Sequence, residues 1–408
     1  MSSSGEWLHS EREVKEAIQS GFSELYITSH SYSALNVPAG SSWQACLSDE
    51  ERDGIEGGVS DDEIKVGLWS LKAFKAQGPN GLHVGFFQRF WLVVGTLVVE
   101  EVRKIFTAME IAEELYRTHI TFIPKIPRSE TLNNYRPISL CNTVYKIVSK
   151  ILVARLRPLL GKLISPLQFA FIPSRRGTDN AIIMQELIHT ICRKKGRHGF
   201  MEVKIDLEKA YDKLEWGFIR EMLIKINLPH NIIKLIMSYV STVSTSIVVN
   251  GGASDLILPS RGLKQGDPIS PYIFILCMDF LVQLIEEKCS TNKWKPVRAN
   301  RSGVAFSHLF FANDLILFAK ANPKNCAAIR EVLDLFCSKS GQSVNGAKSR
   351  VYFSPNVDRD SREDFCATLG FQSTPNLGKY LGIPIKNPGS SSQDFNFVLE
   401  QVKQKLAS

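Results

Sequence analysis

Apolar residues recur every three to four positions along several stretches of the chain, which is the spacing of an amphipathic helix. The pattern is most regular over residues 142–163 and 178–194, and an apolar stretch over 84–109 predicts a third long helix. Ser60 and Glu63 form a capping box, which predicts a helix start just after Ser60. The remaining predicted helices span residues 61–74, 215–226, 231–241, 268–289 and 323–338.

Strands are predicted where apolar and polar residues alternate. Through residues 200–206 the apolar side chains face one side, and Asp206 ends the polar side. Two apolar runs, 309–310 and 315–318, enclose a short polar segment ending at Asp314, which predicts a tight hairpin with polar side chains at its tip. The other predicted strands lie at residues 118–123, 245–249, 256–258, near 351, and at 380–383.

The spacing of these elements indicates the fold class. Stretches rich in Ser, Gly and Asp predict linker at 40–42 and 49–60, and residues 393–406 are predicted to begin a helix. The mixture of hairpins and helices predicts an α+β fold with an antiparallel sheet covered on one face. A chain of 408 residues forms one large domain with subdomains, or two or three small domains.

Composition adds limits on the class of protein. Hydrophobic residues make up 44% and charged residues 22% of the chain, as in an ordinary globular protein. The net charge of +8 favours polyanionic partners without identifying one. Eight cysteines lack the C-x-x-C spacing of a zinc site. The polar N-terminus does not resemble a signal peptide, and the longest apolar stretch, 272–285, is too short and polar to span a membrane.

Two carboxylates stand out as candidate chemistry. Asp206 ends a predicted strand and Asp314 lies at a predicted hairpin tip, so one sheet edge can bring both together. Carboxylate oxygens are the ligands that Mg²⁺ prefers. Each residue also has a local explanation, because Asp206 suits a helix N-cap and Asn313 with Asp314 suits a turn.

Further motifs follow these residues in a fixed order. They are Phe122 to Lys125, Asn134 to Leu140, Gln168 to Arg176, Asp179 with Asn180, Lys204 to Trp216, Gly262 to Pro271, Phe311 to Asp314, Ser340 to Ser349 and Tyr380 to Gly382. In content and order they resemble the reverse transcriptase of non-LTR (LINE-type) retrotransposons, especially those of plants. The resemblance spans residues 60–390 approximately, and so many ordered motifs make it specific.

The resemblance implies a polymerase right-hand fold with fingers, palm and an incomplete thumb. The implied domains are an N-terminal helix and flexible linker at 1–59, an N-terminal extension with fingers at 60–200, a palm at 201–385 and the start of a truncated thumb at 386–408. The chain is expected to be a fragment of a longer polyprotein or a separate open reading frame. The implied site of action is chromosomal DNA in the nucleus.

The implied activity is that of an RNA-directed DNA polymerase, which adds dNTPs to a DNA 3′ end. Its partners would be an RNA template and a DNA primer, with no membrane. Two Mg²⁺ ions, or Mn²⁺ in their place, would stabilise the transferred phosphate by the two-metal mechanism. The resemblance assigns metal binding to Asp206 and Asp314. Asn313 stands where the family has a third catalytic Asp, so activity is expected to be impaired.

Six residues match nucleotide-binding positions of the family: Lys125, Arg136, Tyr211, Gln265, Gly266 and Lys348. Lys125 and Arg136 would hold the triphosphate. The ring of Tyr211 would pack under the sugar and exclude a 2′-hydroxyl. The Gln-Gly pair would lie beside the nucleotide and template, and the last lysine would be a general acid for pyrophosphate. Without a nucleotide-binding role, Lys125 and Arg136 would be ordinary solvated surface residues, and Tyr211 would be a core aromatic residue.

Two alternatives remain at this stage. One is a catalytically inactive retrotransposon relic that at most binds nucleic acid, and the other is a domesticated polymerase or maturase-like factor. The basic loop at 193–198 is a candidate contact to the template backbone by counterion release, or simply a solvated loop.

Overall fold

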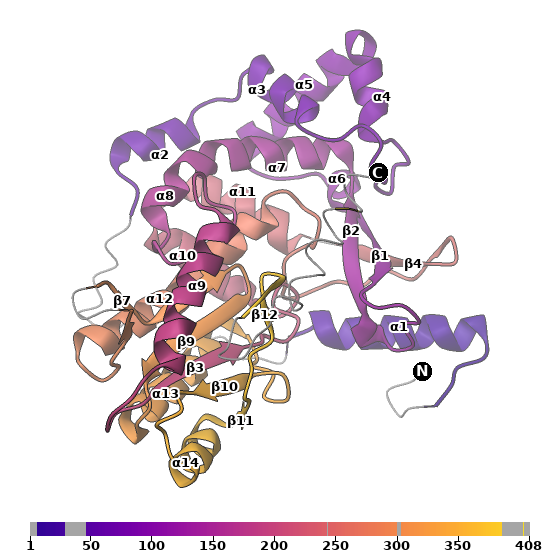
Figure 1. The fold of residues 1–408 in the computed structure, drawn as a ribbon. Helices are drawn as coiled ribbons and strands as arrows, with labels where there is room; N and C mark the ends of the chain where they lie inside the picture. Colours follow the sequence, from indigo (N-terminus) through magenta and orange to yellow (C-terminus); the bar gives the residue numbers. More distant parts are fainter. Residues whose placement is uncertain (1–5, 29–45, 243, 300–302, 386–402, 404–408) are drawn as a thin grey trace. The chain divides into compact units, whose positions relative to one another are not determined.

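The computed structural model describes residues 6–28, 46–242, 244–299, 303–385 and 403 (Figure 1). The chain forms two compact units, and each unit combines three separate segments. The first unit contains Met1–Ile164, Lys209–Cys277 and Lys339–Gln342. The second unit contains Ser165–Glu208, Met278–Ser338 and Ser343–Ser408.

The first unit is mainly helical and holds a four-stranded sheet. Its helices are α1 (Glu11–Tyr26), α2 (Asp49–Glu56), α3 (Asp61–Trp69), α4 (Val84–Arg89), α5 (Trp91–Ala108), α6 (Glu113–Tyr116), α7 (Thr143–Leu156), α8 (Leu160–Leu163), α10 (Trp216–Lys225) and α11 (His230–Ser241), with short 3₁₀ turns at Leu132–Asn134 and Arg157–Leu159. The strand order is β2 (Tyr135–Cys141), β1 (Thr118–Pro124), β4 (Thr245–Val249) and β5 (Gly252–Ala253). β1 pairs antiparallel with β2 and parallel with β4.

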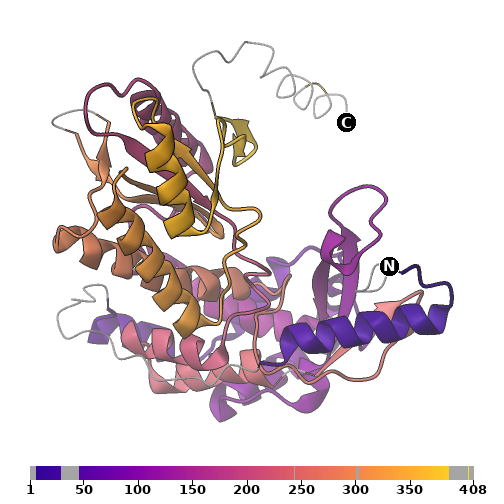
Figure 2. The ribbon, with the colours of Figure 1, turned by 90° about the horizontal axis from the view of Figure 1, so that it is seen from below.

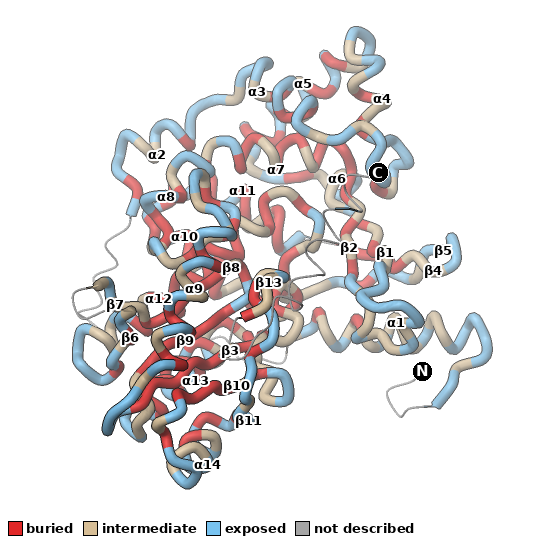
Figure 3. Tube along the Cα trace, in the orientation of Figure 1, coloured by how far each residue is buried: buried red, intermediate tan, exposed pale blue. Residues whose placement is uncertain are grey.

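Helix α1 covers one part of this sheet (Figure 2). Its buried residues Phe22 and Tyr26 share an apolar cluster with Ile120 of β1 and Ile247 of β4. Helix α7 is buried along most of its length, as Figure 3 shows, because both apolar and small polar side chains on it are enclosed. The apolar cluster that α1 shares with β4 joins segments more than 200 residues apart in the chain.

The second unit is built on a five-stranded sheet. The strand order is β11 (Gln372–Ser373), β10 (Arg350–Phe353), β3 (Phe200–Ile205), β9 (Asp314–Lys320) and β8 (His308–Phe311), and its helices are α9 (Gly177–Cys192), α13 (Pro323–Ser340) and α14 (Arg359–Leu369). Two small hairpins pair β6 (Val297–Arg298) with β7 (Ala305–Phe306), and β12 (Lys379–Tyr380) with β13 (Ile383–Pro384). Helix α12 (Ser270–Ser290) contributes residues to both units, and the last two residues of α13 belong to the first unit.

Helices contact both faces of the five-stranded sheet. Met184 and Ile188 of α9 share a buried cluster with Ile316 and Phe318 of β9. On the opposite face of the sheet, Cys326 of α13 contacts Met201 of β3. The prediction of one antiparallel sheet covered on one face is therefore wrong in detail: the described residues form two main sheets, both mixed, although the α+β class is confirmed.

Most of the predicted elements are present, three local predictions are wrong, and several elements were missed. The predicted linker at 49–60 contains α2, and the single helix predicted at 84–109 breaks at Phe90 into α4 and α5. At 256–258 there is no strand, only an isolated bridge between Ile257 and Thr245. Strand β2, helix α14 and the short elements α6, β6, β7 and β11 were not predicted. The predictions at 40–42 and 393–406 lie almost wholly outside the described residues.

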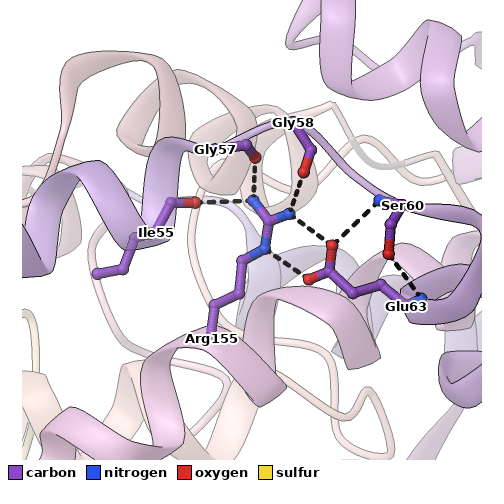
Figure 4. A network of polar contacts seen from close by, with 6 residues as sticks. All are labelled: Ile55, Gly57, Gly58, Ser60, Glu63 and Arg155. Atoms are coloured by element: carbon purple, nitrogen blue, oxygen red, sulfur yellow. Dashed lines mark hydrogen bonds and ion pairs between the residues drawn. The ribbon is translucent and has the colours of Figure 1, made fainter.

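The capping box predicted at Ser60 and Glu63 is confirmed. An arginine from a distant part of the chain explains why the predicted linker is ordered (Figure 4). The buried side chain of Arg155 in α7 forms a two-pronged ion pair with Glu63, at 2.9 Å for both contacts. It also donates to the carbonyl oxygens of Ile55, Gly57 and Gly58. The segment between α2 and α3 is thereby fixed to α7. Among the described helices, none is long and apolar enough to cross a membrane.

Candidate active site

The register of β3 and β9 brings the two candidate carboxylates together. Ile205, the last residue of β3, lies opposite Leu315 of β9 in an antiparallel pair. The next position along each strand is Asp206 on one side and Asp314 on the other, so the two side chains emerge side by side at the end of the sheet. Residues directly opposite on antiparallel strands have Cβ atoms about 4.5–5.5 Å apart. The sequence prediction that one sheet edge unites them is confirmed.

Asn313 occupies the tip of the hairpin that carries Asp314. Phe311 of β8 pairs with Asp314 of β9, leaving Ala312 and Asn313 as a two-residue turn. Ala312 has φ of +55° and Asn313 is exposed. Positive φ at the first turn residue alone is typical of a type II′ hairpin turn. The amide of Asn313 therefore extends from the same tip as the Asp314 carboxyl.

A buried glutamine fixes this turn. Gln168 is 1% exposed, and its Oε1 accepts from the backbone N–H of Ala312 at 3.0 Å. Its Nε2 approaches the carbonyl oxygen of the same residue at 3.5 Å. The backbone N–H of Phe169 also donates to the carbonyl oxygen of Phe310 at 3.0 Å, and the side chain of Asn180 donates to that same oxygen. The segment around Gln168 thus holds the hairpin at its turn and at Phe310, two residues before the turn.

The electrostatic environment of Asp314 suits a bound cation. Loss of hydration raises the pKa of Asp314, the neighbouring Asp206 charge raises it further, and Lys204 opposes the shift. A divalent cation between the two carboxylates would relieve this repulsion. In the described ranges no cluster of three or more His, Cys, Asp and Glu side chains is placed to hold a metal. Mg²⁺ is commonly held by one or two carboxylates, with phosphates and water completing the shell.

The loop before β10 places Lys348 next to Asp206. The backbone N–H of Asn345 donates to the Asp206 carbonyl at 2.8 Å, and the Asp206 N–H donates to Ser349 Oγ at 3.1 Å. Lys348 lies between these two anchors and is exposed, with its backbone N–H bonded to Asn345. The second unit therefore places Asp206, Asn313, Asp314 and Lys348 at one end of its sheet.

The other five predicted residues lie in the first unit. Lys125 and Arg136 share the β1–β2 hairpin: Arg136 lies opposite Ile123, and the Lys125 N–H donates to the Asn134 carbonyl at 2.8 Å. The two basic side chains are therefore diagonal neighbours on one face, within reach of a common ligand. The Lys125 ammonium donates to the Asn133 carbonyl at 2.9 Å, and both basic residues are exposed.

The predicted Gln-Gly turn abuts the same hairpin. The Gln265 carbonyl accepts from the Ser139 N–H of β2 at 2.7 Å. Gly266 has φ of +104°, and a Cβ there would lie 3.3 Å from the Ser139 carbonyl oxygen. Only glycine adopts this conformation readily at such a close approach. Tyr211, also in the first unit, stacks on Phe274 with ring centroids 4.5 Å apart, and burial raises its pKa to about 12.

Asp212 connects these residues and was not assigned a role from the sequence. It is 1% exposed and accepts from both Gln265 Nε2, at 3.1 Å and 3.2 Å, and the Tyr26 hydroxyl. Burial raises the pKa of Asp212 to about 6, while Lys209, these hydrogen bonds and Lys125 act in the opposite direction. Its place directly after Tyr211 in a matched motif was the available signal. Gln168 was likewise inside a matched motif without a role.

Comparisons with known proteins agree with this arrangement. The family model described as reverse transcriptase (RNA-dependent DNA polymerase) matches residues 123–385. The "Transposon TX1 uncharacterized 149 kDa protein" of Xenopus laevis is 23% identical over 83% of this chain and 25% of its own length. The "Retrovirus-related Pol polyprotein from type-2 retrotransposable element R2DM" of Drosophila melanogaster is 24% identical over 76% of this chain and 28% of its own length.

A shorter relative matches more closely. An uncharacterized mitochondrial protein of Arabidopsis thaliana is 40% identical over 112 residues, which are 26% of this chain and 86% of that protein. The chain spans about a quarter of the length of the two transposon relatives. The resemblance to non-LTR retrotransposon enzymes inferred from the motifs is confirmed. Because the family model covers well over half of the 408 residues, including all nine candidate site residues, the chain belongs to the reverse transcriptase family.

Proposed function

We propose that the chain is the RNA-directed DNA polymerase domain of a non-LTR retrotransposon, with activity impaired by Asn313. It would add dNTPs to the 3′ end of a DNA primer on an RNA template. The observation that carries this proposal is the pairing of Asp206 and Asp314 at one end of the five-stranded sheet, with Asn313 at the adjoining hairpin tip. Because such an element acts at chromosomal DNA, the nucleus is the implied compartment.

In this proposal the five-stranded sheet is the palm, and the β1–β2 hairpin belongs to the fingers. The proposed domains keep the boundaries expected from the motifs: 1–59, 60–200, 201–385 and 386–408. The two carboxylates, Asp206 and Asp314, would hold Mg²⁺ or Mn²⁺, which supply charge neutralisation for the transferred phosphate. Asn313 offers one neutral oxygen where the family offers a carboxylate, so this chain presents less negative charge to the cations.

The remaining residues would bind the nucleotide. Arg136 would form paired hydrogen bonds to a phosphate, and Lys125 would act as a point charge beside it. Gly266 would allow the backbone to approach nucleotide and template, and Tyr211 would pack under the sugar. Lys348, held next to Asp206, would donate a proton to the leaving pyrophosphate.

The test is primer extension on an RNA template with Mg²⁺, comparing the natural chain with Asn313→Asp. We expect the variant to extend at least about 10-fold faster, because loss of even an outer-shell partner costs about 10–100-fold at metal sites. Asn292→Asp is the matched control, since Asn292 is also an exposed turn residue of the second unit and gains the same charge. Asp206→Asn in the Asn313→Asp background should abolish extension.

The outcomes separate the alternatives. Equal and robust extension by the natural chain and Asn313→Asp would refute impairment at this position. If neither extends, the second candidate function becomes the better one: an inactive retrotransposon relic that at most binds nucleic acid. Asn313 is the observation that favours this second candidate.

A further inference from the structure

A basic loop joins α9 to β3 in the second unit. It carries Arg193, Lys194, Lys195 and Arg197, and three of these are exposed while Lys194 is partly buried. Lys194 Nζ lies 4.6 Å from the centre of the Phe200 ring, which anchors the loop to the start of the strand. Within the described part of the chain, the side chains of the other three form no ion pair and no hydrogen bond. Their charge is thus available to a ligand.

Two further lysines join the loop at this end of the five-stranded sheet. The Ala321 N–H donates to the Gly199 carbonyl at 2.9 Å, so the end of β9 adjoins the end of the loop. The Lys320 N–H in turn donates to the Lys295 carbonyl at 3.0 Å. We name the resulting set the basic surface: Arg193, Lys194, Lys195, Arg197, Lys295 and Lys320.

Little negative charge opposes the basic surface. On its other side, Asn356 Nδ2 donates to the Gly196 carbonyl at 2.8 Å, which brings the start of α14 close to the loop (Figure 1). The first turns of α14 and its N-cap carry Asp358, Asp360 and Glu363 together with Arg359 and Arg362, a net charge of −1 against the six cations of the basic surface. The basic surface therefore retains a net positive field.

The basic surface is remote from the candidate active site. It lies at the start of β3, and Asp206 follows the other end of that six-residue strand. A strand of this length separates its two ends by about 20 Å. A ligand on the basic surface is therefore not the reacting nucleotide, and its binding is independent of the proposed chemistry.

The side chains of the basic surface indicate the kind of partner. Single-stranded nucleic acid is usually bound by aromatic stacking platforms. The aromatic residues next to this surface, Phe200, Trp294 and Phe353, are buried and unable to stack on bases. Clustered Lys and Arg without stacking suit a regular array of phosphates. We propose that the basic surface binds the phosphate backbone of a nucleic-acid duplex, outside the active site and without sequence preference.

The test measures binding of the full 408-residue chain to a fluorescent 20-base-pair duplex over a series of salt concentrations. The triple variant Arg193→Ala, Lys195→Ala, Arg197→Ala should weaken duplex binding at least about 10-fold and reduce the salt slope by about 3, one unit per lost phosphate contact. The matched control is Arg103→Ala, Lys104→Ala, Lys234→Ala. It removes the same charge from three cations that already pair with Asp61, Glu101 and Glu110.

Three results would overturn the proposal. They are equal losses in the two triple variants, an equal loss with a single strand of the same length, and loss of binding to anionic lipid vesicles without loss of duplex binding. Thermal unfolding of both variants checks folding, and only the Arg193 set should change the salt slope. The measurement needs no catalysis, so a failure of primer extension and a failure of this proposal are distinguishable.

Discussion

At the scale of single residues, the hairpin tip shows how the fold maintains an unfavourable backbone conformation. A left-handed alanine costs about 1 kcal/mol or more relative to an extended one. Ala312 adopts that conformation, and the carboxamide of Gln168 contacts both its N–H and its carbonyl oxygen. Gln168 is therefore a positioning residue, which acts on Asp314 through the turn.

We expect Gln168→Ala, in the Asn313→Asp background, to lower kcat for primer extension about 10-fold or more, because small displacements of reacting groups are costly. KM for dNTP should change little, since the substitution leaves the first unit intact. The control is Gln88→Ala, whose amide likewise hydrogen-bonds to the backbone, donating to the carbonyl oxygens of Leu68 and Leu71. Both variants should lose similar thermal stability. A comparable fall of kcat in both would contradict a positioning role.

A second residue-scale feature is a buried carboxyl in the five-stranded sheet. Glu202 is fully buried between Phe318 of β9 and Tyr352 of β10, and neither of its carboxylate oxygens has a hydrogen-bond partner among the described residues. Burial raises the pKa of Glu202 well above its usual value, and Lys204 opposes the shift only in part. The side chain is therefore protonated in the folded protein at pH values where it is ionised in the unfolded chain.

This difference makes stability depend on pH with a known sign. The contribution of Glu202 is fully present below its unfolded pKa of about 4.3 and is lost as pH rises toward the folded value. Glu202→Leu should therefore raise the free energy of unfolding by about 1–3 kcal/mol at pH 8 and by less at pH 5. Urea denaturation at both pH values measures this. A stability difference that is the same at pH 5 and pH 8 would contradict the assignment.

At the scale of elements, α2 and α3 illustrate a segment ordered by a distant residue. The exposed salt bridges of this chain are expected to contribute little, whereas Arg155 is buried and binds Glu63 and three carbonyl oxygens (Figure 4). Arg155→Ala should cost about 3 kcal/mol, because it leaves several of these groups unpaired. Hydrogen exchange should rise selectively over residues 49–63.

A matched control keeps this prediction specific. Arg12 forms an exposed pair with Glu16 on α1, so Arg12→Ala should change stability by less than about 0.5 kcal/mol. Arg155→Lys should rescue only part of the loss, since a single ammonium cannot reach Glu63 and all three carbonyls at once. Unchanged exchange over residues 49–63 in Arg155→Ala would show that α2 is ordered by other contacts.

Elements with a local signal were predictable from the sequence, and elements ordered from a distance were not. The capping box of α3 and the alternation in β3 depend on residues a few positions apart, and both are confirmed. Helix α2 was missed because its Asp- and Gly-rich composition resembles linker, while Arg155 lies about 100 residues away. The contacts of Gln168 with Ala312 span 144 residues, and no local pattern records them. The matched motifs contain Gln168 and Ala312, but they do not indicate that the two residues are in contact.

At the scale of the whole molecule, neither unit is a continuous piece of chain. The four-stranded sheet takes β1 and β2 from one segment of the first unit and β4 and β5 from another. The apolar cluster behind it likewise combines Phe22 and Ile120 with Ile247 and Ile257. Residues 209–277 therefore bury their apolar side chains against residues 1–164. The reverse transcriptase match begins at residue 123, inside the first of these segments, so the family boundary is not a folding boundary.

This arrangement predicts how a truncated chain behaves. A fragment of residues 165–408 keeps every residue of the five-stranded sheet, but it leaves β4 without its partner β1 and exposes Ile247 and Ile257. Because such exposed apolar surface drives association, we expect the fragment to aggregate and to lack a cooperative thermal transition. Size-exclusion chromatography and circular dichroism measure both properties. Co-expression of residues 1–164 as a separate chain should restore a soluble complex, since the missing contacts are non-covalent. A monomeric fragment that melts cooperatively alone would show that the second unit folds without the first, and that β4 and its neighbours are dispensable for it.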